Sequence, residues 1–288
     1  MKSKKGEGEE KMDERKIFAV IGVGNLGGYY VKSLASYQGE AILQICDPSE
    51  DAIQRAKTLF EEAVGGNQIE LEVCSNIGDL RKHIDILAVA TGSKPRRGIV
   101  EAVFQGREIR YMILEKVLFP CIEDYGIVHK LIKDKGCKTW VNCTRRLNPA
   151  YAKVKSFFEG EKHITFKCSG GEWGLSCNII HIIDLMCYLT GGPQGLVVSA
   201  DHLYPETYES KRAGYLEFFG TVEGKTDSCD YFAISSEKGA EAKTIITIQS
   251  ERKVCVIKEF ELKVTLASLE DGWQCETISI PPLYQSQI

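Results

Sequence analysis

The chain has 288 residues, of which 43% are hydrophobic, and a formal net charge of -4. This length predicts two domains with sizeable cores. The mild negative charge gives no support for nucleic acid or a membrane surface as a partner. No apolar run approaches the roughly 18 residues that a membrane span needs. The first fifteen residues, which are almost all charged or glycine, predict a mobile arm and not a signal peptide.

The eleven cysteines form an odd number and are scattered, and no CxxC pair occurs among them. Several lie within apolar segments, where a reduced thiol behaves as a small hydrophobic group. We therefore expect a cytoplasmic protein with reduced thiols and without a structural metal site.

The segment from residue 18 to residue 47 has the pattern of a dinucleotide-binding unit. A short apolar run, Phe18–Ile21, predicts a buried parallel strand, and a GxGxxG sequence follows it directly. The first glycine permits a tight turn, the second lets the backbone approach a pyrophosphate, and the third lets the next helix pack closely. That helix, from residue 25 to about residue 37, directs its free N–H groups at the phosphates. The expected cofactor-binding residues of this loop are Gly22, Gly24, Asn25, Leu26 and Gly27.

The next predicted strand, residues 41–46, is followed by Asp47, about 20 residues after the last glycine. An acid at this place accepts from the adenosine ribose, and it favours NAD over NADP because it repels a 2′-phosphate. Two simpler interpretations stay open. The glycines also suit a tight turn in another α/β protein, and a carboxylate before Pro48 is also common in turns and helix caps.

Strands and helices alternate up to about residue 142. Further strands are expected at residues 70–74, 84–90, 111–114 and 138–141, and helices at 51–62, 76–83, 97–105 and 122–135. This alternation implies parallel strand pairing with right-handed crossovers. The prediction is an α/β fold whose first domain, residues 16–143, is a Rossmann-type doubly wound sheet of about six strands.

Residues 144–288 are predicted to form an α+β domain with a mainly antiparallel, open sheet. Helices are expected at 148–159 and 177–189, and strands at 163–168, 195–200, 215–221, 231–235, 244–250, 253–260 and 261–267. This domain would carry the substrate pocket or an oligomer contact. Because an open sheet face is normally covered, we expect a homo-oligomer, either a dimer or a tetramer.

In an open α/β sheet, ligands bind beyond the carboxyl ends of the strands. Thr91 and Ser93 flank a glycine at one such end and offer hydroxyl groups to a dinucleotide. Glu115 and Lys116 end the next strand and place an ammonium group where nicotinamide and substrate would meet. For the lysine alone, a solvated surface charge is the simpler interpretation.

Asn142 ends the last parallel strand, and Arg145 and Arg146 follow it closely. The two arginines are candidates for binding substrate. An ion pair between domains is an equally good interpretation of them.

A helix with one polar face is expected at residues 177–189. Asn178, His181 and Asp184 are spaced by three, and Cys177 precedes His181 by four, so these groups share a face of an otherwise apolar helix. Polar groups on a buried helix need partners, and a substrate pocket is one way to supply them. A single histidine here is otherwise more typical of a core residue.

The order of glycine loop, acid, Glu-Lys pair and histidine helix resembles the Gfo/Idh/MocA family, the glucose–fructose oxidoreductase and inositol dehydrogenase group, from Lys16 onward. The family's Glu-Lys-Pro motif, which supplies an active-site lysine, corresponds to Glu115-Lys116. Its Asp-x-Gly-x-His motif corresponds to residues 177–181. The stretch 173–181 also resembles a branch associated with bacterial surface-polysaccharide sugars.

The sequence departs from the family motifs at two positions. Val117 replaces the proline, and Cys177 stands where the family has an acid. The second change removes a carboxylate that would assist the histidine or bind a sugar hydroxyl, and Asn178 offers a neutral hydrogen bond in its place.

The resemblance implies an NAD(H)-dependent oxidoreductase that transfers a hydride between nicotinamide and a secondary alcohol of a sugar, polyol or nucleotide sugar. Lys116 would stabilise the developing alkoxide, and His181 would exchange the proton. The expected substrate-binding residues are Asn178, Cys177, Arg145 and Arg146. Two alternatives stay open. One is a catalytically degenerate NAD-binding sensor or partner subunit, and the other is an imine or amino-acid dehydrogenase.

Overall fold

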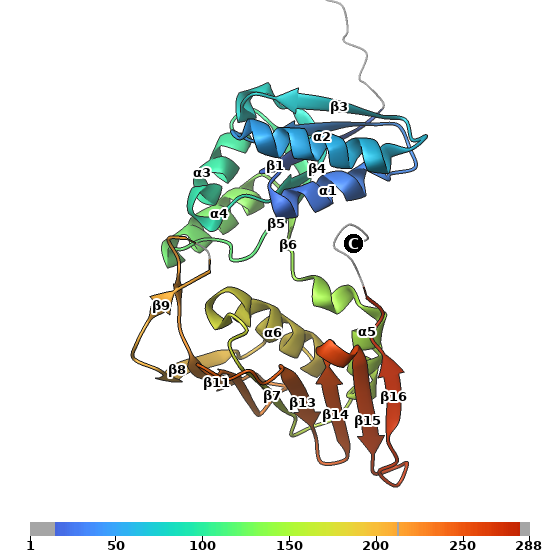
Figure 1. Ribbon diagram of the computed structural model, residues 1–288, viewed down its shortest axis with the longest axis vertical. Coiled ribbons are helices and arrows are strands. Elements are labelled where there is room, and N and C mark those ends of the chain that lie inside the picture. Colours follow the sequence, from blue (N-terminus) through green and yellow to red (C-terminus); the bar gives the residue numbers. More distant parts are fainter. Residues whose placement is uncertain (1–14, 212, 283–288) are drawn as a thin grey trace, which may run out of the picture. The chain divides into compact units, whose positions relative to one another are not determined.

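The computed structural model describes residues 15–211 and 213–282 of the chain (Figure 1). The chain divides into two compact units between Asn142 and Cys143. Apart from Arg15, the mobile arm expected at the start of the chain lies outside the described residues.

The first unit contains a six-stranded, wholly parallel sheet with the strand order β3-β2-β1-β4-β5-β6. This order is that of a doubly wound sheet, and it confirms the predicted fold class. The six strands are β1 (Lys16–Ile21), β2 (Ala41–Cys46), β3 (Ile69–Cys74), β4 (His83–Val89), β5 (Glu108–Leu114) and β6 (Lys138–Val141).

Helices cover both faces of this sheet, because alternate residues of each strand point to opposite sides. In β1, Phe18 and Val20 pack into one core cluster, and the residues that alternate with them pack into another. The first cluster is completed by α1 (Asn25–Ala35) and α2 (Glu50–Val64). The second is completed by α3 (Ser93–Val103) and α4 (Ile122–Asp134) (Figure 1).

The prediction of a helix at residues 76–83 is wrong, because only the short 3₁₀ turn η1 (Ile77–Asp79) forms there. Asn76 and Asp79 cap each other across this turn, and Leu80 then takes an extended conformation at φ -63° and ψ 147°. Because Leu80 is buried at 4% exposure, the chain turns directly from η1 into the core and β4.

The second unit contains an eight-stranded mixed sheet with the order β16-β15-β14-β13-β7-β12-β11-β8. Its neighbouring strands are antiparallel except for β7 and β12, as predicted for a mainly antiparallel sheet. The strands are β7 (Thr165–Gly170), β8 (Val197–Leu203), β11 (Gly220–Lys225), β12 (Tyr231–Ser236), β13 (Ile245–Gln249), β14 (Lys253–Lys258), β15 (Lys263–Ser268) and β16 (Glu276–Ser279).

One core cluster joins this sheet to α5 (Pro149–Phe157) and α6 (Leu175–Thr190), which lie on the same face of it (Figure 1). Two 3₁₀ turns complete the unit, η2 (Thr144–Leu147) before α5 and η3 (Glu259–Glu261) after β14.

The single strand expected at residues 215–221 is two strands. β10 (Leu216–Glu217) pairs with β9 (Tyr208–Glu209) in a separate small sheet, and β11 begins at Gly220. Gly220 has φ +106°, and a Cβ there would lie 2.5 Å from the carbonyl oxygen of His202. The chain therefore changes sheets at a position that only glycine suits. β9 and β16 were not expected.

All eleven cysteines lie in the described part of the chain, and each is a free thiol. Burial raises the pKa of Cys74 to about 11 and that of Cys229 to about 11. Among the described residues, no group of three His, Cys, Asp or Glu side chains is placed to hold a metal ion. Within the same residues, every helix is too short or too polar to cross a membrane.

Candidate functional site

The glycine loop joins β1 to α1 in a conformation that its three glycines make possible. Gly22 has φ +83°, and a Cβ on Gly27 would lie 1.9 Å from the carbonyl oxygen of Gly22. At Gly24, by contrast, an added Cβ would meet nothing within 4 Å. The first and third glycines are therefore required for packing, and the second leaves open space beside the backbone.

The helix that follows this loop begins without a side-chain cap. Gly24 is its N-cap residue, and the first turn, with Asn25 and Leu26, carries no acidic residue. Such a helix start offers N–H groups and a positive dipole end to an anion. The loop and the helix start together fit the pyrophosphate of a dinucleotide.

Asp47 lies at the carboxyl end of β2, beside the glycine loop. Its Oδ2 accepts from the backbone N–H of Val23 at 2.8 Å, and its Oδ1 accepts from the backbone N–H of Ser49 at 2.8 Å. The carboxylate thus fixes the loop, and because each oxygen has two lone pairs it keeps capacity to accept from a hydroxyl group.

Thr91 follows β4, and Ser93 opens α3 as a buried residue. The Oγ1 of Thr91 is buried and has no hydrogen-bond partner among the described residues. The Cγ2 of Thr91 would lie 2.7 Å from a Cβ added to Gly22, so Thr91 packs directly against the glycine loop.

Arg96 is a structural residue of this edge that the sequence analysis missed. It lies on α3 and is 1% exposed. Its guanidinium donates to the carbonyl oxygens of Val117 at 2.5 Å and Leu118 at 2.8 Å, and also to that of Thr91. Arg96 therefore connects the chain after β4 to the chain after β5. No sequence signal indicated this role, because the helix expected here began only at residue 97, whereas α3 begins at Ser93.

Glu115 and Lys116 follow β5 at the same edge of the sheet. Glu115 is 3% exposed, and its Oε1 accepts from Tyr30 Oη at 2.8 Å and from Asn142 Nδ2 at 2.6 Å. These bonds connect the end of β5 to α1 and to the end of β6. Lys116 is half-buried, and a cis peptide bond joins it to Val117. The backbone position of the lysine is thus set by a buried, hydrogen-bonded neighbour.

The predicted histidine helix forms as α6 in the second unit, with Cys177, Asn178 and His181 all half-buried. Asn178 Nδ2 donates to the carbonyl oxygen of Trp173 at 3.0 Å. The carboxylate of Glu217, from β10, accepts from the backbone N–H of Ser176 at 2.8 Å and so caps the helix. The sequence analysis did not identify Glu217, because no local motif connects β10 to α6.

Arg145 and Arg146 both form two-point ion pairs inside the second unit. Arg145 Nε and Nη2 lie 2.9 and 3.2 Å from the two carboxylate oxygens of Glu259. Arg146 Nε lies 3.0 Å from Asp184 Oδ2, and its Nη2 donates to Oδ1. Asp184 therefore pairs with an arginine of η2. A contact of either arginine with substrate stays a prediction.

The predicted residues fall into two sets. The cofactor set and Lys116 follow the carboxyl ends of β1, β2, β4 and β5, so the parallel sheet brings them to one edge of the first unit. The substrate set lies on η2 and α6 in the second unit.

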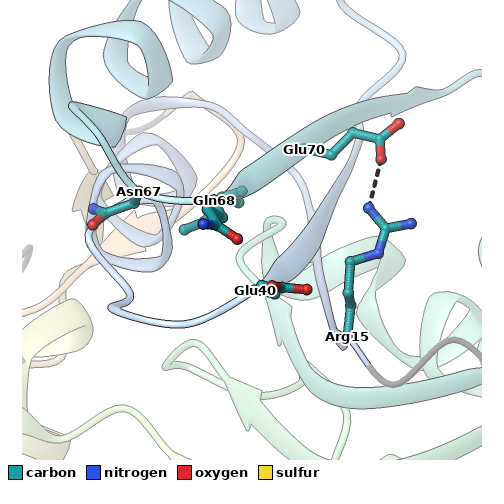
Figure 2. A pocket seen from close by; sticks show the side chains of 6 residues that line it. Arg15, Glu40, Asn67, Gln68 and Glu70 are labelled. Atoms are coloured by element: carbon teal, nitrogen blue, oxygen red, sulfur yellow. Dashed lines mark hydrogen bonds and ion pairs between the residues drawn. The ribbon is translucent and has the colours of Figure 1, made fainter.

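A hollow of about 350 Å³ lies at the opposite edge of the parallel sheet, where the strands begin (Figure 2). Figure 2 shows Arg15 reaching Glu70 beside it, at 2.8 Å. The hollow is also lined by Glu40, which precedes β2, and by Asn67 and Gln68, which precede β3. Because it lies away from the glycine loop, this hollow is not part of the candidate site.

The doubly wound sheet and its glycine loop define the first unit as an NAD(P)-binding Rossmann domain. Residues 16–143 match the oxidoreductase family with an NAD-binding Rossmann fold known as GFO_IDH_MocA. The first unit therefore matches the Gfo/Idh/MocA oxidoreductase family that the sequence resemblance predicted. No curated protein matches the sequence significantly.

Solved structures share the fold over almost the whole chain at low sequence identity. UDP-N-acetylglucosamine 3-dehydrogenase GnnA from Acidithiobacillus ferrooxidans is 13% identical with a TM-score of 0.70, over 95% of this chain and 85% of that one. The dehydrogenase MviM from Clostridium difficile is 14% identical with a TM-score of 0.69, over 95% and 86%. Biliverdin reductase from Synechocystis sp. PCC 6803, solved with biliverdin and NADP+, is 13% identical with a TM-score of 0.69, over 94% and 86%.

Proposed function

We propose that this protein transfers a hydride between a nicotinamide cofactor, NAD in preference to NADP, and a secondary alcohol of a sugar, polyol or nucleotide sugar. The observation that carries the proposal is the position of Lys116. It follows β5 at the edge that holds the glycine loop, next to Glu115, whose carboxylate is hydrogen-bonded to Tyr30 and Asn142. An ammonium group placed there suits the stabilisation of an alkoxide.

The residues of the first unit fit a dinucleotide. The open space at Gly24 and the uncapped start of α1 suit the pyrophosphate, and Asp47 suits a ribose hydroxyl. The bound nicotinamide would supply the hydride chemistry. The preference for NAD rests on the negative charge of Asp47, which would repel a 2′-phosphate.

The protein's own side chains handle the substrate oxygen and its proton. In alcohol oxidation, Lys116 donates a hydrogen bond to the reacting oxygen, and a ring nitrogen of His181 takes the hydroxyl proton as the carbon loses its hydride. Asn178 and Cys177, which lie on one turn of α6, contact the other hydroxyl groups of the substrate. In the reverse direction, His181 returns the proton to the carbonyl oxygen.

The test is turnover on a panel of sugars, polyols and nucleotide sugars, followed at the absorbance of reduced nicotinamide. On any substrate that reacts, K116A should lower the rate by about 10²–10⁴ if the ammonium acts in the chemical step. K130A, which replaces an exposed lysine of α4, serves as the matched control. Full turnover by K116A would remove the lysine from the mechanism.

A second candidate function is a cofactor-binding sensor or partner subunit without catalysis. Cys177 and Val117, which replace residues of the family motifs, favour it. Tight NAD binding in a calorimetric titration, together with no turnover on the whole panel, would support this candidate over the enzyme.

We also propose a homo-oligomer that forms through the second unit. The eight-stranded sheet packs α5 and α6 on one face, and half-exposed apolar residues of β14, Val254 and Val256, alternate with the core residues and point to the other face. Sedimentation velocity of the full chain tests this, and a monomer across the micromolar range would contradict it.

A further inference from the structure

The carboxylate of Glu217, in β10, uses only one of its two oxygens within the second unit. Its Oε1 accepts from the backbone N–H of Ser176, at the start of α6, at 2.8 Å, and from that of its neighbour Phe218 at 3.2 Å. No hydrogen bond or ion pair joins the other oxygen, Oε2, to a described residue. The side chain is half-buried. One oxygen thus holds the backbone in place, and the other keeps its two lone pairs for a further donor.

Gly174 brings this second oxygen close to the side chain of Asn178. Gly174 is the N-cap residue of α6 and has φ +80°, in the left-handed region that favours glycine. A Cβ added there would lie 3.1 Å from Asn178 Nδ2 and 3.6 Å from Glu217 Oε2. An amide nitrogen of α6 and a carboxylate oxygen of β10 therefore border one point, which the glycine leaves without a side chain.

The strand pair that carries Glu217 is anchored at its base. Phe218 packs against the core cluster of the second unit, and Phe219 is 5% exposed. Tyr208, in β9, lies edge-on to Phe219 with 5.4 Å between the ring centres, and Lys238 Nζ lies 4.0 Å from the centre of the Tyr208 ring. A polar group on such a fixed base loses little conformational freedom when it binds a ligand.

We propose that Glu217 is a substrate-binding residue, whose Oε2 accepts a hydrogen bond from a hydroxyl group of the substrate beside Asn178. The inference rests on the function proposed above, because it concerns the substrate of that site. The part of the substrate that meets β10 would then carry hydroxyl groups and no negative charge, which fits the ring of a sugar or polyol. An anionic group, such as the carboxylate of an amino acid, would be repelled there.

The surroundings of Glu217 favour a neutral donor over a cation. The N–H group of Ser176 and the positive end of the α6 dipole already balance part of the negative charge of the carboxylate. A hydroxyl group supplies one charge-assisted hydrogen bond without adding a charge of its own. Asn178, to which the proposed function assigns contacts with substrate hydroxyl groups, lies beside the same oxygen.

Two variants separate substrate binding from the capping of α6. E217Q keeps an oxygen for the N–H groups of Ser176 and Phe218, but it puts an amide group that donates in place of Oε2. E217A removes both oxygens. If Glu217 only caps the helix, E217Q should behave as the unmodified protein, and E217A alone should melt at a lower temperature. If Glu217 binds substrate, E217Q should melt normally and still bind substrate poorly.

The test is an NMR titration of the full chain, with and without NAD, using D-glucose, myo-inositol and UDP-glucose as probes. The reporter is the side-chain amide of Asn178, which is identified by its absence in N178D. We expect at least one probe to shift this resonance to saturation, and E217Q to raise the dissociation constant of that probe about tenfold or more.

The matched control is E223Q, which changes another half-buried glutamate of the second unit. Glu223 alternates with the buried Val222 in β11, so it points to the opposite face of the sheet from α6. This variant should bind the probe as the unmodified protein does.

The proposal is overturned if no probe shifts the Asn178 amide, or if E217Q binds the responding probe as tightly as the unmodified protein. Should E217Q not fold, a crystal of the unmodified protein soaked with that probe decides. A probe hydroxyl within hydrogen-bonding distance of Glu217 Oε2 supports the inference, and a probe bound out of reach of this oxygen contradicts it.

The outcome is separable from that of the proposed function. On a substrate that turns over, E217Q should raise KM and leave kcat nearly unchanged, because a contact with a hydroxyl group that does not react is equally strong in the ground state and the transition state. An unchanged KM would leave the proposed function standing and remove Glu217 from the site. If nothing turns over, the proposed function fails, and the titration still shows whether Glu217 binds hydroxyl groups.

Discussion

Glu115 Oε1 and Asn142 Nδ2 lie 2.6 Å apart, and this hydrogen bond connects the carboxyl ends of β5 and β6. Tyr30 Oη donates to the same oxygen from α1 at 2.8 Å. One buried carboxylate oxygen thus connects two strands and the helix of the glycine loop. The residue that precedes the candidate lysine is therefore also a structural centre of the nucleotide-binding unit.

Replacing Glu115 by alanine should destabilise the first unit. Tyr30 and Asn142 would lose their shared acceptor, and a buried side chain would be missing, so we expect a loss of about 2–3 kcal/mol in the free energy of unfolding. E115Q keeps an oxygen for both donors and should lose less than about 1 kcal/mol. Urea unfolding followed by circular dichroism measures both. Equal losses in the two variants would show that the hydrogen bonds are not the source of the stability.

The second and third glycines of the loop should differ sharply in their response to alanine. G27A places a methyl group 1.9 Å from the carbonyl oxygen of Gly22, whereas G24A places it in open space. We expect G27A to disrupt the loop and G24A to leave the melting temperature nearly unchanged while weakening NAD binding by about tenfold or more. Unchanged NAD affinity in a folded G24A protein would contradict the assignment of the pyrophosphate site.

These glycines also indicate how far the sequence can predict the structure. The loop, α1 and Asp47 are close in the chain, and their spacing is fixed by one strand-helix-strand unit, so local rules suffice for this part of the first unit. The pairing of Arg145 with Glu259 spans 114 residues. No local pattern indicates this ion pair. η3, which follows β14, meets η2 only when the whole second unit is packed.

The position of Arg96 was unpredictable for a different reason. A charged residue is rarely buried, so a sequence pattern assigns an arginine to the surface. Here three backbone carbonyl groups, left without strand partners after β4 and β5, accept from it. The need for such a donor becomes evident only when both loops are placed side by side.

Asp47→Asn should reduce the preference for NAD over NADP. The asparagine keeps the size of the side chain and one of the two oxygens that accept from Val23 and Ser49, and it removes the charge that would repel a 2′-phosphate. We expect the ratio of the two dissociation constants to change by about tenfold, which corresponds to about 1.4 kcal/mol. Fluorescence titrations with NADH and NADPH measure the ratio. A ratio equal to that of the unmodified protein would show that Asp47 does not select the cofactor.

The thiols should react with a thiol reagent in two well-separated phases. Cys121 and Cys275 are exposed, whereas seven cysteines are buried. Because burial raises the pKa of a thiol such as Cys74 to about 11, the reactive thiolate is scarce at pH 8 as well as inaccessible. We expect the C121S/C275S double variant to lose the fast phase and keep the slow one. Cys143 and Cys177 are half-buried, so a surviving fast phase of more than two thiols would contradict the burial of the other seven.

The ion pair between Arg145 and Glu259 should make the second unit less stable as the pH falls. Burial raises the pKa of Glu259, but the hydrogen bond and charge of Arg145, together with the hydrogen bond of Tyr151, bring its folded-state pKa below the ordinary value. The contribution of the ion pair to the free energy of unfolding is then complete above the ordinary carboxyl pKa. It is lost as the pH falls through the lower pKa of the folded state. At pH 7, E259Q should lower the free energy of unfolding by about 1–2 kcal/mol. This is less than for a fully buried ion pair, because both side chains are about one-third exposed. Thermal unfolding of both proteins from pH 7 down to pH 3 tests this, and the gap between them should narrow as the pH falls. A gap that stays constant or widens in acid would mean that Glu259 is not charged in the folded state.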